Sequence, residues 1–467
     1  MILAVTSGAF AHPKNHNDNS CDITVAPAAT LLLPFFDVDI GDSQGDETTL
    51  FTITNVTRMP QIAHVTVWTD WGYPLLAFNV LLTGYDVQAI SLSDVFNHGR
   101  LAPVVISPLQ GGGIAPPLPN DSNPNIARDA FGPGGVCSSL PAVVPSDVLA
   151  AIRTALTTGL YNPSTTVCAN RRVGGTHTNA RGYLTIDVVS TCSTKFADNP
   201  DFIRKELLFD NVLIGDYQQV DGHFMSAQAE PMVHIRAIPE GGPAGSYPGT
   251  NLPYTFYDRY TVTFPPATAR TFDRRQPLPS SFAARWIDNG RDVKTHYKLW
   301  REGLTVGTQS CADAQRNSAM PFEAIRFDEQ ENSFSSNWCH VVQPFCAAVR
   351  ALPAAARVST SSFPFPDNVS NAQGGWMYIN LSNGGSDFYS ANGYSGVTPF
   401  APEGSNTKTR PSQGWVIVSM SAEGRFALDL DAAQLGNGCT PVDTYQQTHI
   451  GPAQNETPSG FISRPPH

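Results

Sequence analysis

The sequence predicts an all-β protein made of several β-sandwich domains, with one or two short helices packed on the sheets. Short segments in which every second residue is apolar recur along the chain, as expected for strands with one buried face. The 467 residues include 38 glycines and 38 prolines, a content that favours frequent turns over long helices. At about 150 residues per domain, this length allows roughly three domains.

The first β-sandwich domain is predicted over residues 23–106. Strands are expected at 31–40, 50–54, 62–68, 75–82 and 87–92. In the third of these, Ala63, Val65 and Val67 share one face, whereas His64 and Thr66 share the other. This alternation predicts a strand that is buried on one side only.

Two segments of this domain carry a family resemblance. The sequences TLFTITN at 49–55 and AHVTVW at 63–68, which a turn over 55–60 is expected to join, resemble the immunoglobulin-like modules of bacterial surface and periplasmic proteins. The resemblance covers residues 30–95 and implies an immunoglobulin-like sandwich. It carries no functional residue with it.

Two further β-rich domains are predicted, over 137–270 and 271–440, after a Gly/Pro-rich linker or loop at 107–136. The second domain contains the clearest helix of the chain, 146–158, with Ser146 as N-cap and Gly159 after its end. Its strands are expected at 183–189, 207–214, 232–238 and 254–264.

The third domain is expected to contain a short helix at 344–352 and two similar strands. The segments GGWMYINLS at 374–382 and QGWVIVSMS at 413–421 each have Gly, then Trp, then alternating apolar residues. We interpret them as two equivalent strands of one sheet. A polar tail at 441–467 follows.

The N-terminus and the cysteines predict export. Residues 1–11 end in Ala9-Phe10-Ala11, a small-x-small pattern typical of signal peptides, and a polar leader follows at 12–22. The eight cysteines form no C-x-x-C pair, which favours disulfides over a zinc or thioredoxin-type site. Short separations favour the pairs Cys137–Cys168 and Cys339–Cys346, and buried thiols in a cytosolic core are the alternative. A secreted, periplasmic or cell-surface location follows.

Charge and hydropathy limit the classes of partner that the sequence allows. The 29 basic and 40 acidic residues give a net charge of −11, which argues against nucleic acid, since such binding needs clustered cations. The sequence contains no apolar run of the length that a transmembrane segment requires. A glycan or another cell-surface protein remains as partner.

Three catalytic patterns fail on their context, so no catalytic residue is predicted. Ser43 stands in a G-x-S-x-G match whose Gly-Asp-Ser core is similar to that of the GDSL hydrolases, but a strand pattern follows it instead of the helix that a nucleophile elbow needs. A second acidic cluster is interpreted as an exposed turn in preference to the carboxylate pair of a glycosidase; its residues are Asp328, Glu329 and Glu331. His223 and His234 have only Glu230 as a third zinc ligand.

Two sets of residues are candidate binding groups. An acidic turn offers only hard oxygens, which favour Ca²⁺, although a solvated hairpin is the alternative; its residues are Asp37, Asp39, Asp42, Asp46 and Glu47. Trp68 and Trp71 flank Asp70 and are candidate platforms for sugar rings. Arg274 and Arg275 beside Asp273 are interpreted as structural ion pairs. No other cofactor is implied.

Together these patterns predict an exported, disulfide-bonded β-sandwich protein with an extracytoplasmic binding or structural role. A secreted hydrolase acting on polysaccharides or esters is the alternative. Its acids would come from separate strands and would leave no local signature.

Overall fold

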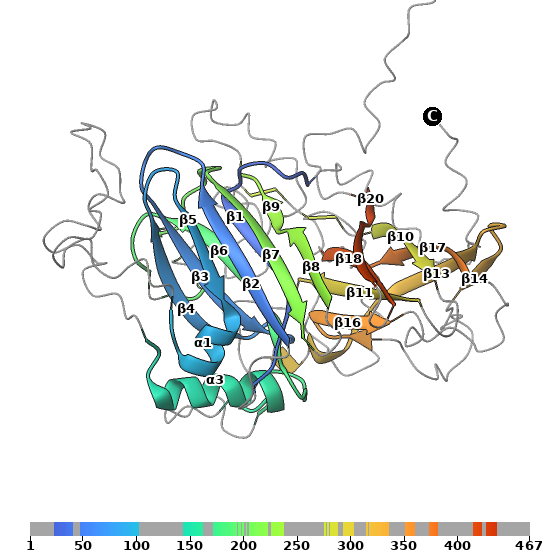
Figure 1. Cartoon of the computed structure of the whole chain (residues 1–467), viewed down its shortest axis with the longest axis horizontal. Helices are drawn as coiled ribbons and strands as arrows, with labels where there is room; N and C mark the ends of the chain where they lie inside the picture. The colour runs from blue at the N-terminus through green and yellow to red at the C-terminus, as the bar shows by residue number, and fades with distance from the viewer. Residues whose placement is uncertain are drawn as a thin grey trace, which may run out of the picture.

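The computed structural model describes residues 23–40, 47–101, 143–161, most of 171–237 and, in the C-terminal part, most of 275–335 with 351–359, 373–381, 414–422 and 426–436. These residues form antiparallel sheets arranged as two packed β-sandwiches, with short helices at one end of the first (Figure 1). The protein is therefore all-β, as its alternating patterns predict. Among the described helices, none is long and apolar enough to span a membrane.

The first sandwich consists of a five-stranded and a four-stranded sheet. The five-stranded sheet, called the central sheet here, has the order β4-β3-β6-β1-β9, and the outer sheet has the order β5-β2-β7-β8. The strands are β1 (Thr30–Val38), β2 (Glu47–Asn55), β3 (Gln61–Thr69), β4 (Pro74–Leu82), β5 (Val87–Ser91), β6 (Ala180–Val189), β7 (Leu213–Asp221), β8 (Ser226–Pro231) and β9 (Val233–Ile235).

Strands from two of the expected domains share both sheets of this sandwich. β6 lies between β3 and β1, and β7 pairs with β2 over nine residues, from Glu47↔Asp221 to Asn55↔Leu213. The segments on either side of the expected linker at 107–136 are thus interleaved in one sandwich. The turn at 55–60 also differs from a hairpin, because β2 belongs to the outer sheet and β3 to the central sheet. Asn55 supports this crossing by donating to the Met59 and Thr83 carbonyls at 2.7 and 2.8 Å.

Two helices cover one end of the first sandwich (Figure 1). Helix α1 (Leu92–His98) is capped by the Ser91 hydroxyl, and α3 (Ser146–Thr158) has the predicted bounds, although Pro145 and not Ser146 is its N-cap. Gly159 ends α3 in the left-handed region at φ 71°. Its buried residues, Ile152, Ala155 and Leu156, pack into the core of the sandwich.

The second sandwich also pairs a four-stranded with a five-stranded sheet. The near sheet, which packs on the first sandwich, has the order β16-β11-β18-β19, and the far sheet has the order β14-β13-β17-β10-β20. The bounds are β10 (Ser281–Ile287), β11 (Lys294–Arg301), β13 (Glu323–Asp328), β14 (Ser333–Ser335), β16 (Ala355–Ser359), β17 (Gly374–Asn380), β18 (Gly414–Ala422), β19 (Phe426–Asp431) and β20 (Ala433–Gly436). A two-stranded sheet of β12 (Met320–Pro321) and β15 (Ala351–Leu352), with a 3-10 turn at Asn317–Ala319, lies beside them.

Two expectations for this part are corrected. The similar Trp-containing segments are β17 and β18, which lie in different sheets, not in one sheet. They resemble each other because both are interior strands that send apolar residues, Met377 and Ile379 from one and Val416 and Val418 from the other, into the same core. At the end of the expected helix 344–352, residues 351–352 form strand β15; the rest of that range lies outside the described residues.

The central sheet is buried on both faces. One face packs against the outer sheet in an apolar core that includes Val65, Leu184 and Ile186. The other face is covered by Cys192, Ala197, Phe202 and Leu207 and by the second sandwich, whose Trp300 meets Tyr183 edge to face at 5.7 Å between ring centroids. All nine residues of β3 are therefore buried, where the alternation predicts one buried face.

Polar contacts accompany this apolar junction between the sandwiches. The Ala355 amide donates to the Asp70 carbonyl at 2.9 Å, and the Asn317 side chain donates to the Trp71 carbonyl at 2.9 Å. The Lys298 ammonium donates to Gln228 at 3.1 Å. The two sandwiches are thus held in one fixed arrangement by contacts that involve the first, second and third expected domains.

Candidate functional site

A cleft of about 400 Å³ lies where the two sandwiches meet. One wall comes from β8 and β9 of the first sandwich, and the other from β18, β19 and β20 of the second. Residues 23–25 form a third side. A cavity of this size, at a junction between folded units, is a common position for a ligand site.

The polar groups of the cleft come from three segments. Glu230 accepts a hydrogen bond from the Tyr217 hydroxyl at 3.2 Å. His234 is buried, and its Nε2 accepts from the Gly215 amide at 3.2 Å. Gln434 donates to the Ile23 carbonyl at 3.1 Å and accepts from the Ile23 amide at 3.3 Å. These bonds hold the side chains in defined positions at the cleft.

Burial lowers the pKa of His234, so its imidazole is neutral at pH 7. Because Nε2 acts as acceptor, the proton of the neutral ring is on Nδ1. His234 therefore brings no positive charge to the cleft, and its Nδ1 is buried. Among the described residues that line the cleft there is no Lys or Arg, and Glu230 is the one carboxylic acid.

Trp415 is the aromatic residue among the described residues that line the cleft. It is half-buried, packs against all three large core clusters, and meets Phe282 edge to face with ring centroids 6.0 Å apart. It pairs with Trp300 across β18 and β11. Its ring is consequently held by both sandwiches while part of it lines the cleft.

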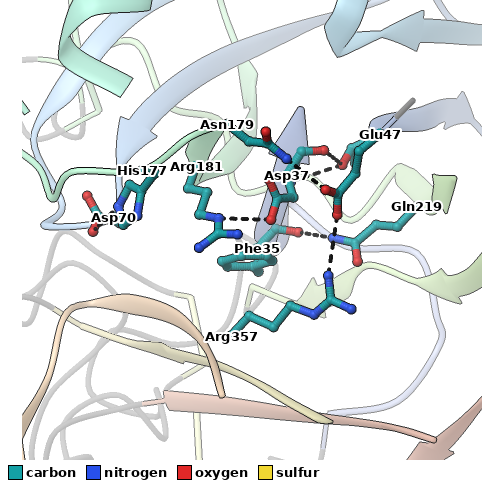
Figure 2. Close-up of polar contacts among 10 residues, drawn as sticks. Phe35, Asp37, Glu47, Asp70, His177, Asn179, Arg181, Gln219 and Arg357 are labelled. Carbon is teal, nitrogen blue, oxygen red and sulfur yellow. Dashed lines mark hydrogen bonds and ion pairs between the residues drawn. The ribbon is translucent and has the colours of Figure 1, made fainter. Parts of the chain in front are cut away.

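A second polar cluster lies at the start of β6, as Figure 2 shows. Three alternate residues each bind a different acid: His177 meets Asp70 at 3.0 Å, Asn179 donates to Glu47 at 2.7 Å, and Arg181 donates to Asp37 at 2.8 Å. We call these six residues the polar row. Arg357 reaches the row from the second sandwich, 3.3 Å from Glu47.

Two carboxylates of the polar row have altered acidity. Burial raises the pKa of Asp37, and the neighbouring Arg181 opposes that rise. Burial, with repulsion from Asp37, raises the pKa of Glu47 to about 7. Two guanidinium groups, those of Arg181 and Arg357, therefore face two carboxylates that would otherwise resist ionisation.

The structure brings together only part of the predicted acidic turn. Asp37 and Glu47 lie side by side in the polar row, and the Asp39 amide donates to the Glu47 carbonyl at 2.8 Å. Asp42 and Asp46 lie outside the described residues. Asp37 is 1% exposed, so it is not part of a solvated hairpin. No group of three potential metal ligands occurs among the described residues, and Ca²⁺ at this turn stays a prediction.

The two predicted tryptophans are not equivalent. Trp68 is fully buried, stacks on Tyr183 with ring centroids 5.6 Å apart, and donates to the Thr185 hydroxyl at 2.9 Å. Its expected place on a recognition surface is corrected, because residues of the second sandwich and the segment around Phe202 cover this face. Trp71 is half-buried against the first core.

The remaining predicted residues have the following positions. Asp328 closes the turn after β13 by accepting from the Gln330 and Asn332 amides, each at 2.9 Å. Glu329 pairs with Arg285 at 2.9 Å. Arg275 forms a structural ion pair with Asp187, 3.0 Å away, and Asp273 and Arg274 lie outside the described residues. Ser43 and the cysteines 137, 168, 339 and 346 lie outside the described residues.

Cys192 is the one cysteine that the structure describes, and it is 4% exposed and disulfide-bonded. Its partner lies outside the described residues.

Comparisons with protein-family models, with curated proteins and with solved structures find no match to this chain. The case for a functional site at the cleft therefore rests on the geometry of the cleft alone. Sequence reasoning considered Glu230 and His234 only as zinc ligands, and it did not identify Trp415 or Gln434. The QGW start of the 413–421 segment marks a strand, but nothing local indicates that its Trp lines the same cleft as a histidine 181 residues earlier in the chain (415 − 234).

Proposed function

We propose that this chain is an exported, disulfide-bonded binding protein that holds its ligand in the cleft between the two sandwiches. The observation that carries this proposal is the cleft itself, which combines one aromatic side chain with a few fixed polar groups. Ligand sites generally have this composition, because apolar surface supplies affinity and a few polar groups fix orientation.

The disulfide at Cys192 and the N-terminal segment support an extracytoplasmic location. Disulfides persist in oxidising compartments, and the 1–11 segment has the pattern of a signal peptide. The fixed contacts between the two sandwiches support the binding role itself. A cleft whose two walls are fixed relative to each other binds without the cost of closing two mobile domains.

A secreted hydrolase is the second candidate, and the polar row favours it. Catalytic acids often have raised pKa values, and Asp37 and Glu47 share that property. Their arginine partners, however, are also what a structural ion-pair network provides. Turnover of a polysaccharide or ester that Glu47→Gln abolishes in a folded protein would favour the hydrolase.

The binding proposal is tested by blocking the mouth of the cleft. Val25 lines the cleft and is 64% exposed, so Val25→Arg should fill the opening without disturbing the fold. Val87 on β5 does not line the cleft and is 58% exposed, so Val87→Arg is a matched control. We expect a fragment library, screened by ligand-observed NMR on the oxidised full chain, to yield ligands that Val25→Arg loses and Val87→Arg retains. Ligands whose binding neither substitution changes, or a screen that finds no ligand, would contradict the proposal.

A further inference from the structure

We propose that this chain forms a dimer in solution, in which the outer sheets of two copies pack face to face. The surface concerned is the side of the outer sheet that points away from the core of the first sandwich, called the outer face here. Three properties of the outer face carry this inference: its exposure, its low charge and its size. The inference goes beyond the cleft and does not depend on a ligand there.

The outer face is built by alternate residues of four paired strands. Phe51 of β2 and Tyr217 of β7 point into the core of the first sandwich, so the residues next to them in each strand point outward. The register aligns the outward residues in rows, because Thr52 pairs with Ala89 on one side and with Asp216 on the other. The exposed side chains of the outer face are those of Val87, Ala89, Asp216, Gln218, Ala227 and Ala229. The face is therefore open to solvent.

The outer face carries a single charged residue. Its outward positions are every second residue over 87–91 of β5, 50–54 of β2, 214–220 of β7 and 227–229 of β8, and Asp216 is the one Asp, Glu, Lys or Arg among them. A solvated surface of this extent would ordinarily include about three charged residues. The other outward residues are aliphatic or carry an uncharged polar group. Depletion of charge is typical of a surface that packs on another protein.

Charge also identifies the partner as a second copy of this chain. The net charge of −11 makes two copies repel each other through most of their surface, so self-association requires a face with little charge. A cationic partner would find only Asp216 to pair with on the outer face. Two sheet faces with side chains of moderate size pack well at about 10 Å, and identical faces related by a two-fold axis form a closed dimer.

The size of the outer face predicts a weak, reversible dimer. At about 4.8 Å between strands and about 3.4 Å per residue, the four strands span roughly 20 Å by 25 Å. Each copy would then bury about 500 Å², and the total of about 1,000 Å² is at the lower limit for specific interfaces.

Asp216 lies at the centre of the outer face. It is in the middle of β7, an interior strand, and its carboxylate accepts from the Thr52 hydroxyl of the other interior strand at 2.7 Å. In a dimer whose two-fold axis passes near the centre of the face, the two Asp216 carboxylates lie close together and repel each other. The charge of Asp216 should therefore weaken the dimer.

The test is sedimentation velocity of the oxidised full chain over a wide range of protein concentrations, at about 0.05 and about 0.5 M NaCl. We expect a monomer–dimer equilibrium with a micromolar or weaker dissociation constant. Association should be tighter at the higher salt, where repulsion between the two acidic chains is screened. A chain that stays monomeric at every concentration and at both salt levels would overturn the proposal.

Substitutions on two strands locate the interface. Val87→Glu on β5 and Gln218→Glu on β7 should each weaken the dimer at least tenfold, because they add negative charge to both of the packed faces. Val148→Glu makes the same change of charge at an exposed position of α3, outside the outer face, and should leave the dissociation constant unchanged. If Val87→Glu fails to fold, the isosteric Gln218→Glu still decides the location. A dimer that Gln218→Glu leaves intact does not use the outer face, and the proposal is then wrong.

Asp216→Asn tests the packing of the two faces. The substitution keeps an acceptor for the Thr52 hydroxyl and removes the central charge, so the dimer should bind at least threefold more tightly. Its association should also depend less on salt than that of wild type. A weaker dimer in Asp216→Asn would contradict the face-to-face packing.

Discussion

The two faces of the central sheet are both buried, yet they are built from different residues. The face toward the outer sheet is apolar, with Val65, Leu184 and Ile186 among its residues. The face toward the second sandwich carries buried polar groups, including His64 and Asp187, both 0% exposed, among aromatic residues.

Because of this difference, the two faces play different parts: one stabilises the first sandwich, and the other positions the second sandwich on it. An apolar face stabilises the sandwich in proportion to the area that it removes from water, but it tolerates small shifts of its neighbours. Buried polar groups need their partners at defined distances, because an unsatisfied one costs about 1 to 3 kcal/mol. The polar face is therefore suited to fix how the second sandwich sits on the first, and the cleft between them depends on that arrangement.

The strongest test of this comparison is the buried ion pair. Arg275 lies 3.0 Å from Asp187 and 3.2 Å from the Thr30 hydroxyl, and both charged side chains are 0% exposed. Arg275→Met removes the guanidinium from a buried carboxylate, and we expect it to lower the free energy of unfolding by about 3 to 5 kcal/mol. Urea unfolding of the full chain, followed by tryptophan fluorescence, measures this change.

The control removes both charged side chains of this ion pair from the polar face. In the double variant Arg275→Met/Asp187→Leu neither charge remains, so most of the lost stability should return. If the polar groups fix the arrangement, this stable double variant should nevertheless bind cleft ligands more weakly. A double variant that is stable and binds like wild type would break the comparison.

The comparison also explains what the sequence could and could not predict. The bounds of α3 follow from local signals, an apolar stripe and a terminal glycine, and the structure confirms them. The alternation in β3 marks a strand correctly, but it cannot reveal that His64 and Thr66 face a second protein layer instead of water. β7 was expected at 207–214 and lies at Leu213–Asp221, since pairing with β2, and not apolar alternation, determines it.

The cleft could not be predicted for the same reason. Its walls come from residues 230–234 and 415–434, and only the packing of two sandwiches brings them together. The interleaving of β6 and β7 into the first sandwich is likewise a long-range pairing with no local signal. Local patterns predict elements, whereas contacts between distant segments determine the site.

A second, smaller effect is expected from His64 when the pH falls. Its ring is fully buried beside Asn79, with 2.9 Å between Nδ1 and the amide oxygen, and burial lowers its pKa from 6.5 to about 4. The unfolded chain takes up a proton below pH 6.5 and the folded chain does not, so stability is lost as the pH falls from 6.5 to 4.

Between pH 7 and 5 this histidine should therefore lower the free energy of unfolding by about 2 kcal/mol. His64→Gln keeps a polar side chain that can reach Asn79 and does not titrate. We expect the pH-dependent loss in the variant to be smaller than in wild type by about that amount. Equal losses in the two proteins would show that His64 does not stay neutral in the folded state.

The smallest effect is expected at the rim of the junction, where Glu47 meets Arg357 3.3 Å away. Burial raises the pKa of Glu47 from 4.5 to about 7, so the folded chain binds this proton more tightly than the unfolded chain does. The resulting stabilisation is complete below pH 4.5 and is lost as the pH rises through 7, opposite in sign to the effect of His64. Because the side chain is partly exposed, solvent screening should keep it below about 1 kcal/mol.

Three variants measured at pH 5 and pH 8 sharpen this last prediction. Glu47→Gln should remove its share of the pH dependence, so the variant gains stability relative to wild type at pH 8 compared with pH 5. Arg357→Gln should enlarge that share, because it removes a cation that favours the ionised carboxylate. The double variant should behave like Glu47→Gln, since no carboxylate remains for Arg357 to influence. An Arg357→Gln effect that persists in the double variant would mean that Arg357 acts at this rim through a partner other than Glu47, and the second sandwich would then not be coupled to the polar row by this pair.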